Sequence, residues 1–174
     1  MDDQAAVNFL KENNARHYWH PMADPKASET DPPLILTKGD GFQVWDVDGK
    51  PYLDLMGGLW NVNVGHNRTE VKDAIIAQMD QLSYHNTFAG LANAPSIELS
   101  VKLTDMMAPE GMDKVMFGSG GSDANETAFK LARQYWKLMD QAEKVKVFSL
   151  KNGYHGMQFG ALSASGGIVW RRAY

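Results

Sequence analysis

The sequence predicts an α/β fold, because a strand, a glycine-rich turn, a helix and a second strand follow one another in its second half. Residues 115–117 and 145–150 are short apolar runs expected to form strands, and residues 123–139 carry apolar side chains at helical spacing. Strands joined through a helix normally pair in parallel. Upstream of this βαβ unit, Asp48-Gly49 adds the signal of an antiparallel hairpin.

The residues before the βαβ unit predict an arm, a hairpin and two helices. The first 40 residues are rich in Pro, Asp and Asn and are expected to form an irregular arm. Residues 42–54 flank the Asp48-Gly49 turn and predict the hairpin, since Gly adopts a positive φ without penalty. Residues 69–82 and 95–107 predict helices, the second with a proline in its first turn.

Composition narrows the class of protein. The chain has 174 residues, 44% of them hydrophobic and 22% charged, which predicts a folded domain rather than a disordered chain. A net charge of −4 gives no general attraction to nucleic acid or anionic membranes. Cysteine is absent, so disulfides and thiolate metal sites are excluded. Without a signal peptide or about 18 consecutive apolar residues, we expect a soluble, cytoplasmic protein.

The glycine-rich segment 117–125 is the main candidate for ligand binding. Glycines let backbone N–H groups approach an anion, and the helix N-terminus adds positive potential. Ser122 offers a hydroxyl donor, while Glu126 is interpreted as complementing the helix dipole. Spacing alone supports an anion site and a ligand-free turn capped by Ser122 equally. The segment contains neither a Walker A motif nor a dinucleotide-binding fingerprint.

Two other segments are weaker candidates when taken alone. Residues 151–156 follow a predicted strand end, where ligands bind in open α/β sheets. There, Tyr154 can offer a ring face and His155 a hydrogen-bond donor, although an ordinary surface turn is the better interpretation. Trp60 can wall a pocket, but a core tryptophan is commoner. The five histidines lack metal-ligand spacing, so no metal site is predicted.

Five motifs in order resemble one enzyme family along nearly the whole chain. Residues 116–133 resemble the phosphate-binding segment of class III, omega-type aminotransferases, which are fold type I enzymes that use pyridoxal 5′-phosphate. Residues 152–156 are similar to the next motif of that family, and residues 18–22, 45–49 and 58–66 also resemble it. The most similar subgroup is the omega-amino acid–pyruvate and amine–pyruvate transaminases.

The resemblance implies roles for individual residues. Gly121 and Ser122 would hold the cofactor phosphate, and Tyr154 would stack on the pyridine ring with His155 beside it. The implied substrate pocket includes Met22, Leu59, Trp60 and Phe88. Of these, Phe88 would reach the partner subunit's site, because members of the family form homodimers with shared active sites. The usual Ser-Gly-Ser-Glu reads Gly-Gly-Ser-Asp at residues 120–123.

The resemblance also implies a domain organisation and a reaction. Residues 1–66 would begin the small domain, and residues 67–174 would begin a truncated large domain that binds the cofactor. The implied reaction transfers an amino group between an amine or omega-amino acid and a keto acid such as pyruvate. The family's Schiff-base lysine and pyridine-nitrogen aspartate lie downstream of the Tyr-His-Gly motif, so no catalytic residue is assigned. The alternatives are a catalytically incompetent fragment that binds phosphate or a partner chain, and a nucleotide-binding βαβ domain.

Overall fold

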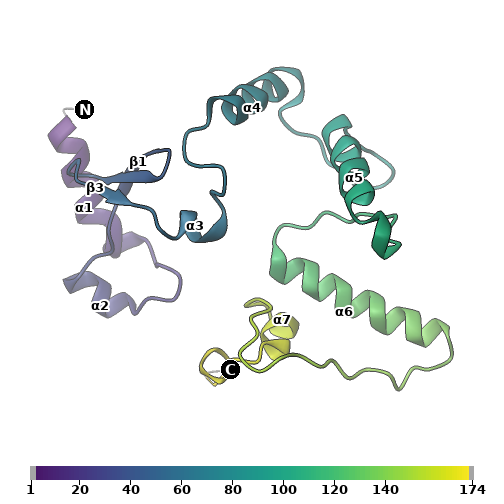
Figure 1. The fold of residues 1–174 in the computed structure, drawn as a ribbon. Coiled ribbons are helices and arrows are strands. Elements are labelled where there is room, and N and C mark those ends of the chain that lie inside the picture. Colours follow the sequence, from purple (N-terminus) through teal and green to yellow (C-terminus); the bar gives the residue numbers. More distant parts are fainter. Residues whose placement is uncertain (1–2, 173–174) are drawn as a thin grey trace. The chain divides into compact units, whose positions relative to one another are not determined.

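The computed structural model describes residues 3–172, which divide into two compact units at the junction of residues 86 and 87 (Figure 1). The first unit contains α1 (Asp3–His17), α2 (Pro25–Thr30), β1 (Leu36–Asp40), β2 (Gln43–Asp46), β3 (Pro51–Leu53), α3 (Gly57–Trp60) and α4 (Thr69–Leu82). Its three strands form an antiparallel sheet in the order β1-β2-β3. The predicted hairpin is therefore confirmed, with β1 as an additional strand.

The carboxylate of Asp46, at the end of β2, organises the hairpin turn. It accepts three hydrogen bonds, from Asp48 N–H at 3.0 Å, Lys50 N–H at 2.9 Å and the Tyr52 hydroxyl at 2.8 Å. Gly49, with a φ of 80°, supplies the left-handed residue of the turn. Burial alone would raise the pKa of Asp46, but these hydrogen bonds and the charge of Lys50 lower it below the usual value.

The prediction of an irregular arm over the first 40 residues is wrong, because α1, α2 and β1 lie within it. Helix α1 lacks an apolar stripe and is anchored by polar contacts: Lys11 pairs with Asp48, and Asn14 Nδ2 donates to Pro33 O at 2.7 Å. Polar helices give little periodic signal. Similarly, β1 is identified by its pairing with β2 and not by its own polar sequence.

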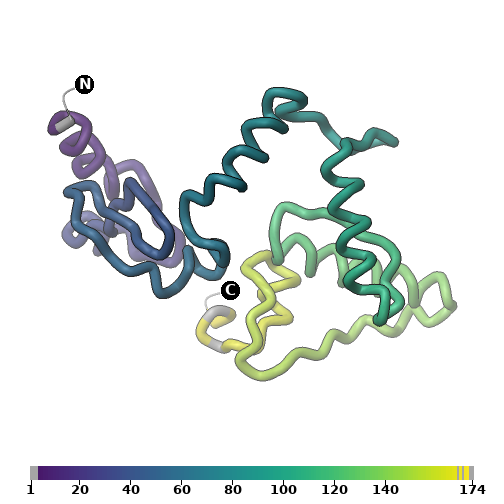
Figure 2. The backbone as a smooth tube through the Cα atoms, turned by 45° about the horizontal axis from the view of Figure 1, so that its top comes forward, coloured from purple at the N-terminus to yellow at the C-terminus, as the bar shows by residue number. Residues whose placement is uncertain are grey.

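The second unit is dominated by helices. It contains α5 (Ala94–Met106), the 3₁₀ turn η1 (Ala108–Glu110), α6 (Gly121–Leu138), α7 (Phe159–Ala164) and α8 (Ile168–Arg171). The three helices predicted from periodicity are confirmed with ends shifted by two residues or fewer. Asn93 caps α5 by accepting from Ser96 N–H at 3.0 Å. After α6 the chain runs back alongside that helix to reach α7 (Figures 1 and 2).

The prediction of strands at 115–117 and 145–150 is wrong for the described residues 3–172, where neither segment forms a strand. A strand is stabilised by its ladder of interstrand hydrogen bonds, and no neighbouring strand supplies one here. The chain is α/β in content, as predicted, but its sheet is the antiparallel one of the first unit. Within the described residues, no helix has the length and apolar character needed to cross a membrane.

We predict that Asp46→Asn destabilises the first unit at neutral pH, because the amide keeps one neutral oxygen for the two backbone N–H groups and its NH2 group cannot accept from the Tyr52 hydroxyl. Since the pKa of Asp46 is lowered by folding, its ionised form stabilises the fold above the ordinary value of 3.8, and this contribution fades as the pH falls below it. Urea unfolding at several pH values measures both effects. Asp40→Asn, at an exposed position of β1, is the control and should change little. Equal loss in both variants would contradict the role of Asp46.

Candidate functional site

The N-terminus of α6 is open and carries no side-chain cap. Gly120 is the N-cap residue, and no side chain accepts a hydrogen bond from the first turn on its behalf. Instead, Asp123 Oδ2 accepts from Ser119 N–H at 3.0 Å and folds the preceding loop back onto the helix. Apart from the adjacent residues and the helix's own backbone, no described atom lies within 4 Å of where a Cβ would stand on Gly120 or Gly121. Among the described residues, the N-cap of α6 makes no side-chain hydrogen bond to the first turn, and N–H groups at such a helix start are suited to bind an anion.

Two side chains of α6 hold the backbone of the loop that contains Tyr154 and His155. Ser122 Oγ accepts a hydrogen bond from Met157 N–H at 3.0 Å, so Ser122 does not cap its own helix. Asn125 Nδ2 donates to His155 O at 2.7 Å. These contacts span 35 and 30 residues of sequence and bring the glycine-rich turn and the Tyr-His-Gly segment together.

Glu126 makes a third contact of the same kind. Its Oε1 accepts from the N–H of Ala161, a residue with no exposed surface, at 2.8 Å. Gly160 permits this approach, because a Cβ there would lie 2.6 Å from Glu126 Oε2. Gly156 is equally constrained, since its Cβ would overlap Ser122 Oγ. Ser122, Asn125 and Glu126 share one face of α6 at i, i+3 and i+4, and we call them the α6 clasp.

Ser165 supports the held loop from inside. It is fully buried, and its hydroxyl accepts from His155 N–H at 2.9 Å and donates to Ala161 O at 3.0 Å. Sequence reasoning missed Asn125 and Ser165 and gave Glu126 only a dipole role. The sequence did contain a signal for these contacts. Ser122, Asn125 and Glu126 have helical spacing, and the segment that they contact contains Gly156 and Gly160, four residues apart.

The four residues expected to bind the cofactor lie in this one region of the second unit. Gly121 and Ser122 form the first turn of α6, and the clasp fixes the backbone beside Tyr154 and His155. Tyr154 is 58% exposed and His155 is half-buried, so both side chains are accessible from solvent. Their roles remain predictions, but their proximity to the open helix end is a property of the fold.

Leu59 and Trp60 lie in the first unit, in a turn of unusual handedness. Four consecutive residues, 57–60, have φ between 55° and 65°, which is the left-handed region. Such a conformation costs roughly 1–2 kcal/mol for each residue with a side chain. Both side chains are well exposed, at 58% and 76%. Of the other residues expected at the substrate pocket, Met22 belongs to the first unit and Phe88 to the second, and both are exposed.

Asp54 and His66 form a close pair beside this turn. Asp54 Oδ2 lies 2.7 Å from His66 Nε2 and accepts from Gly58 N–H at 2.8 Å. The hydrogen bond from His66 is the main reason that the pKa of Asp54 is lowered, although burial opposes the shift. Across the described residues, no group of three or more acidic or histidine side chains is arranged to bind a metal ion.

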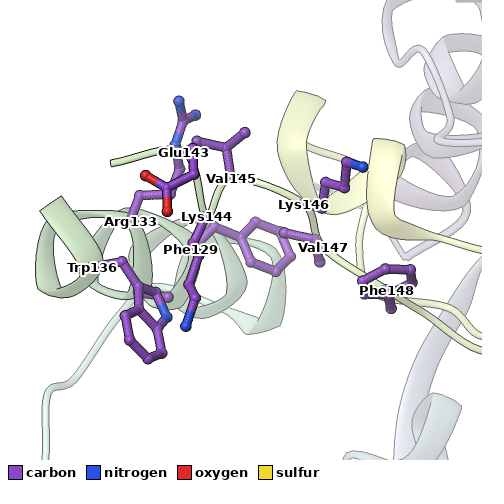
Figure 3. A pocket seen from close by; sticks show the side chains of 10 residues that line it. Phe129, Arg133, Trp136, Glu143, Lys144, Val145, Lys146, Val147 and Phe148 are labelled. Carbon is purple, nitrogen blue, oxygen red and sulfur yellow. The ribbon is translucent and has the colours of Figure 1, made fainter. Parts of the chain in front are cut away.

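A separate groove of about 450 Å³ lies between α6 and the returning chain (Figure 3). Phe129 and Trp136 of α6 line it together with Val147 of the returning chain, and Lys144 Nζ lies 3.4 Å from the centroid of the Trp136 ring. Several apolar residues of this region remain exposed, including Phe148 at 90%. The groove therefore has the character of a packing surface and not of a catalytic centre.

Comparisons with known proteins agree with this geometry. The model of the class-III aminotransferase family matches residues 25–169. The chain is 39% identical over 150 residues to a putrescine–pyruvate aminotransferase of Pseudomonas aeruginosa, covering 86% of this chain and 33% of that protein. It is 40% identical over 152 residues to a taurine–pyruvate aminotransferase of Bilophila wadsworthia, covering 87% and 32%.

Solved structures give the same result. An (S)-enantioselective omega-transaminase from Thermomicrobium roseum matches with a TM-score of 0.90 and 41% identity, over 97% of this chain and 37% of that one. A PLP-bound amine transaminase from an uncultivated Pseudomonas species matches with a TM-score of 0.84 and 48% identity, over 88% and 35%. The chain belongs to the class III aminotransferase family, and it spans about a third of the length of the relatives it matches.

Gly156→Ala is predicted to separate the loop from α6, because the new methyl group would overlap Ser122 Oγ. Overpacking of this kind costs about 1–3 kcal/mol. Gly111→Ala is the matched control, since Gly111 also has a positive φ but open space around its Cβ. Amide hydrogen exchange over residues 153–162 should rise in Gly156→Ala only. If both variants exchange alike, the contact with Ser122 does not hold the loop.

Glu126→Ala is predicted to leave the buried Ala161 N–H without an acceptor, at a cost of about 1–3 kcal/mol in the free energy of unfolding. Glu126→Gln keeps an oxygen at the same reach and should recover most of that loss. Chemical denaturation of the two variants beside the wild type measures the difference. If Glu126 acted only through its charge on the helix dipole, Glu126→Gln and Glu126→Ala would lower the free energy of unfolding equally. That result would contradict the role of the hydrogen bond.

Proposed function

We propose that this chain supplies the cofactor-phosphate part of an active site in which the whole protein transfers an amino group from an amine or omega-amino acid to a keto acid such as pyruvate. The observation that carries the proposal is the uncapped N-terminus of α6 with its open space at Gly120 and Gly121. That geometry suits the phosphate of pyridoxal 5′-phosphate, the cofactor implied by membership of the class III family.

The hydrogen-bonding state of Ser122 also fits a phosphate ligand. A serine hydroxyl has one hydrogen to donate and two lone pairs to accept. Met157 N–H occupies a lone pair of Ser122 Oγ, which leaves the hydroxyl hydrogen for a phosphate oxygen. Gly121 and Ser122 would add their backbone N–H groups, and the helix dipole favours the dianion. The donors needed to hold a phosphate are therefore present in one helical turn.

The α6 clasp would fix the ring-binding residues relative to the phosphate-binding turn. When bound, the cofactor supplies an electron sink for chemistry at the amino-bearing carbon. Tyr154 would cover one face of its ring, and His155 would border it. Because Asn125 bonds to the carbonyl of His155, a displacement of the loop from α6 would cost this hydrogen bond. Rigid positioning of this kind is what orientation-dependent catalysis requires.

The names of two relatives support a proposal for the donor and the acceptor. Two of them are named for transfer to pyruvate from putrescine and from taurine, which are small amines with a terminal amino group. We extend this to the present protein as an amine or omega-amino acid donor and a keto acid acceptor. Met22, Leu59 and Trp60 would border the substrate, and Phe88 would reach the site of a second subunit in a cytoplasmic homodimer.

A second candidate function is favoured by the exposed apolar surface of the second unit. Leu131, Val147 and Leu150 are 54%, 53% and 82% exposed. Apolar surface of this extent marks a site for further polypeptide. The 174-residue chain by itself would then act as a module that binds phosphate and a partner chain, without turnover.

Binding of pyridoxamine 5′-phosphate tests the phosphate site, because this ligand has no aldehyde to react with surface lysines. Calorimetric titration should show that the chain binds it more tightly than pyridoxamine, which lacks the phosphate, and that inorganic phosphate competes. Ser122→Ala should weaken binding by roughly five- to tenfold, the value of one hydrogen bond. Gly121→Ala should also weaken it while the fold stays intact, since its methyl group meets no protein atom.

Ser163→Ala, at an exposed serine of α7, is the control and should bind as the wild type does. Equal affinity for pyridoxamine and its phosphate would overturn the proposed phosphate site. Alanine formation from pyruvate and an amine donor tests the reaction of the whole protein.

A further inference from the structure

The left-handed turn formed by residues 57–60 needs an external constraint to persist. Gly57 and Gly58 adopt φ values of 55° and 57° at little cost, but Leu59 and Trp60 adopt 56° and 65° against the preference of their side chains. Residues in such conformations persist when the surrounding structure over-determines them, and they cluster at functional sites. The contacts of this turn therefore indicate which residues hold it in the left-handed conformation.

Asp54 is the side chain that ties the start of the turn. One carboxylate oxygen, Oδ2, accepts from Gly58 N–H at 2.8 Å and lies 2.7 Å from His66 Nε2. The backbone carbonyl of Asp54 also accepts from Gly57 N–H at 3.2 Å. The Asp54 side chain is only 14% exposed and that of His66 24%, so water competes little for these bonds. The Asp54–His66 pair therefore stabilises the first half of the turn, at Gly57 and Gly58.

His66 in turn is fixed to the sheet. Its N–H donates to Gly41 O at 2.7 Å, and its carbonyl accepts from Gly41 N–H at 3.1 Å. Gly39 of β1 lies against the imidazole, since a Cβ on Gly39 would stand 2.8 Å from His66 Cγ. The connection thus runs from the sheet through His66 and Asp54 to Gly58. The orientation of the turn is set by the sheet and not by the turn alone.

The second half of the turn is held by its own residues. Trp60 N–H donates to Met56 O at 2.9 Å, and Asn61 Nδ2 donates to Leu59 O at 3.0 Å. These bonds preserve the local shape but do not connect it to the sheet. Among the described residues, the side chains that link the turn to the sheet are those of Asp54 and His66.

We propose that Asp54 and His66 are positioning residues that determine donor selection, by holding the strained turn so that Leu59 and Trp60 present a fixed apolar wall. This inference rests on the proposed function, which places those two side chains at the substrate. If Leu59 and Trp60 are held in place, they exclude amine donors whose apolar groups are too large for the pocket. If they are mobile, they move aside for bulky donors and pack less well against small ones.

Hydrogen exchange tests the hold on the turn without requiring turnover. In Asp54→Ala, exchange of the amides of residues 57–62 should rise by about tenfold or more, which corresponds to the loss of roughly one charge-assisted hydrogen bond. His66→Gln retains an amide donor and should lie between Asp54→Ala and the wild type. Asp73→Asn, at an exposed position of α4, is the charge-matched control and should leave these amides unchanged.

Steady-state kinetics of the whole protein test the consequence for substrates. Across a series of amines of increasing apolar bulk, Asp54→Ala should change KM and flatten the preference in kcat/KM by about tenfold, because one misplaced apolar contact is worth that much. The kcat for the smallest donor should stay within about twofold, since the pair acts through the wall. His66→Gln should restore part of the preference.

Two results would overturn the inference: equal exchange of residues 57–62 in Asp54→Ala and Asp73→Asn, or a loosened turn with an unchanged donor preference. If Asp54→Ala fails to fold, Asp54→Asn, which keeps an acceptor for Gly58 N–H, replaces it with the same expected direction. Absence of transamination in the wild type would instead reject the proposed function, and the exchange data would still decide whether the pair holds the turn.

Discussion

The contact between the α6 clasp and the backbone of residues 155–161 is the constraint on which the candidate cofactor site depends. Ser122, Asn125 and Glu126 reach across 30 to 35 residues of sequence, and each bonds to a main-chain group. Side chains that bond to the backbone fix a loop whatever its own side chains are. The backbone of Tyr154 and His155 is therefore held close to the N-terminus of α6.

Carboxylates have the corresponding role in the first unit. Asp46 gathers three donors at the hairpin turn, and Asp54 joins the left-handed turn to His66. In both cases hydrogen bonding lowers the pKa, so the ionised acceptor is the stable form at neutral pH. An ionised carboxylate accepts several strong hydrogen bonds from one position. It can therefore stabilise turns whose backbone N–H groups have no partner in a helix or sheet.

Few apolar side chains are buried among the described residues. Val44, Ala161 and Leu162 are the buried apolar residues of the described chain, yet an omega-transaminase structure superposes with a TM-score of 0.90 over 97% of its length. Local capping and the polar contacts described above therefore carry much of the geometry. The segments 115–117 and 145–150 form no strand among the described residues. Exposed apolar groups such as Phe148 would suit packing against further polypeptide.

The sequence by itself determined what short-range rules govern, namely the helices at 69–82 and 95–107 and the hairpin at Asp48-Gly49, and its ordered motifs indicated the family. Periodicity, capping and turn chemistry depend on residues close together in the chain, so the elements that they form can be predicted from the sequence. Only the tertiary structure decided that α1 and β1 are ordered, that Glu126 serves Ala161 N–H, and that residues 57–60 turn left-handed. Those outcomes depend on partners distant in sequence, and no local pattern encodes which partner a polar side chain will meet.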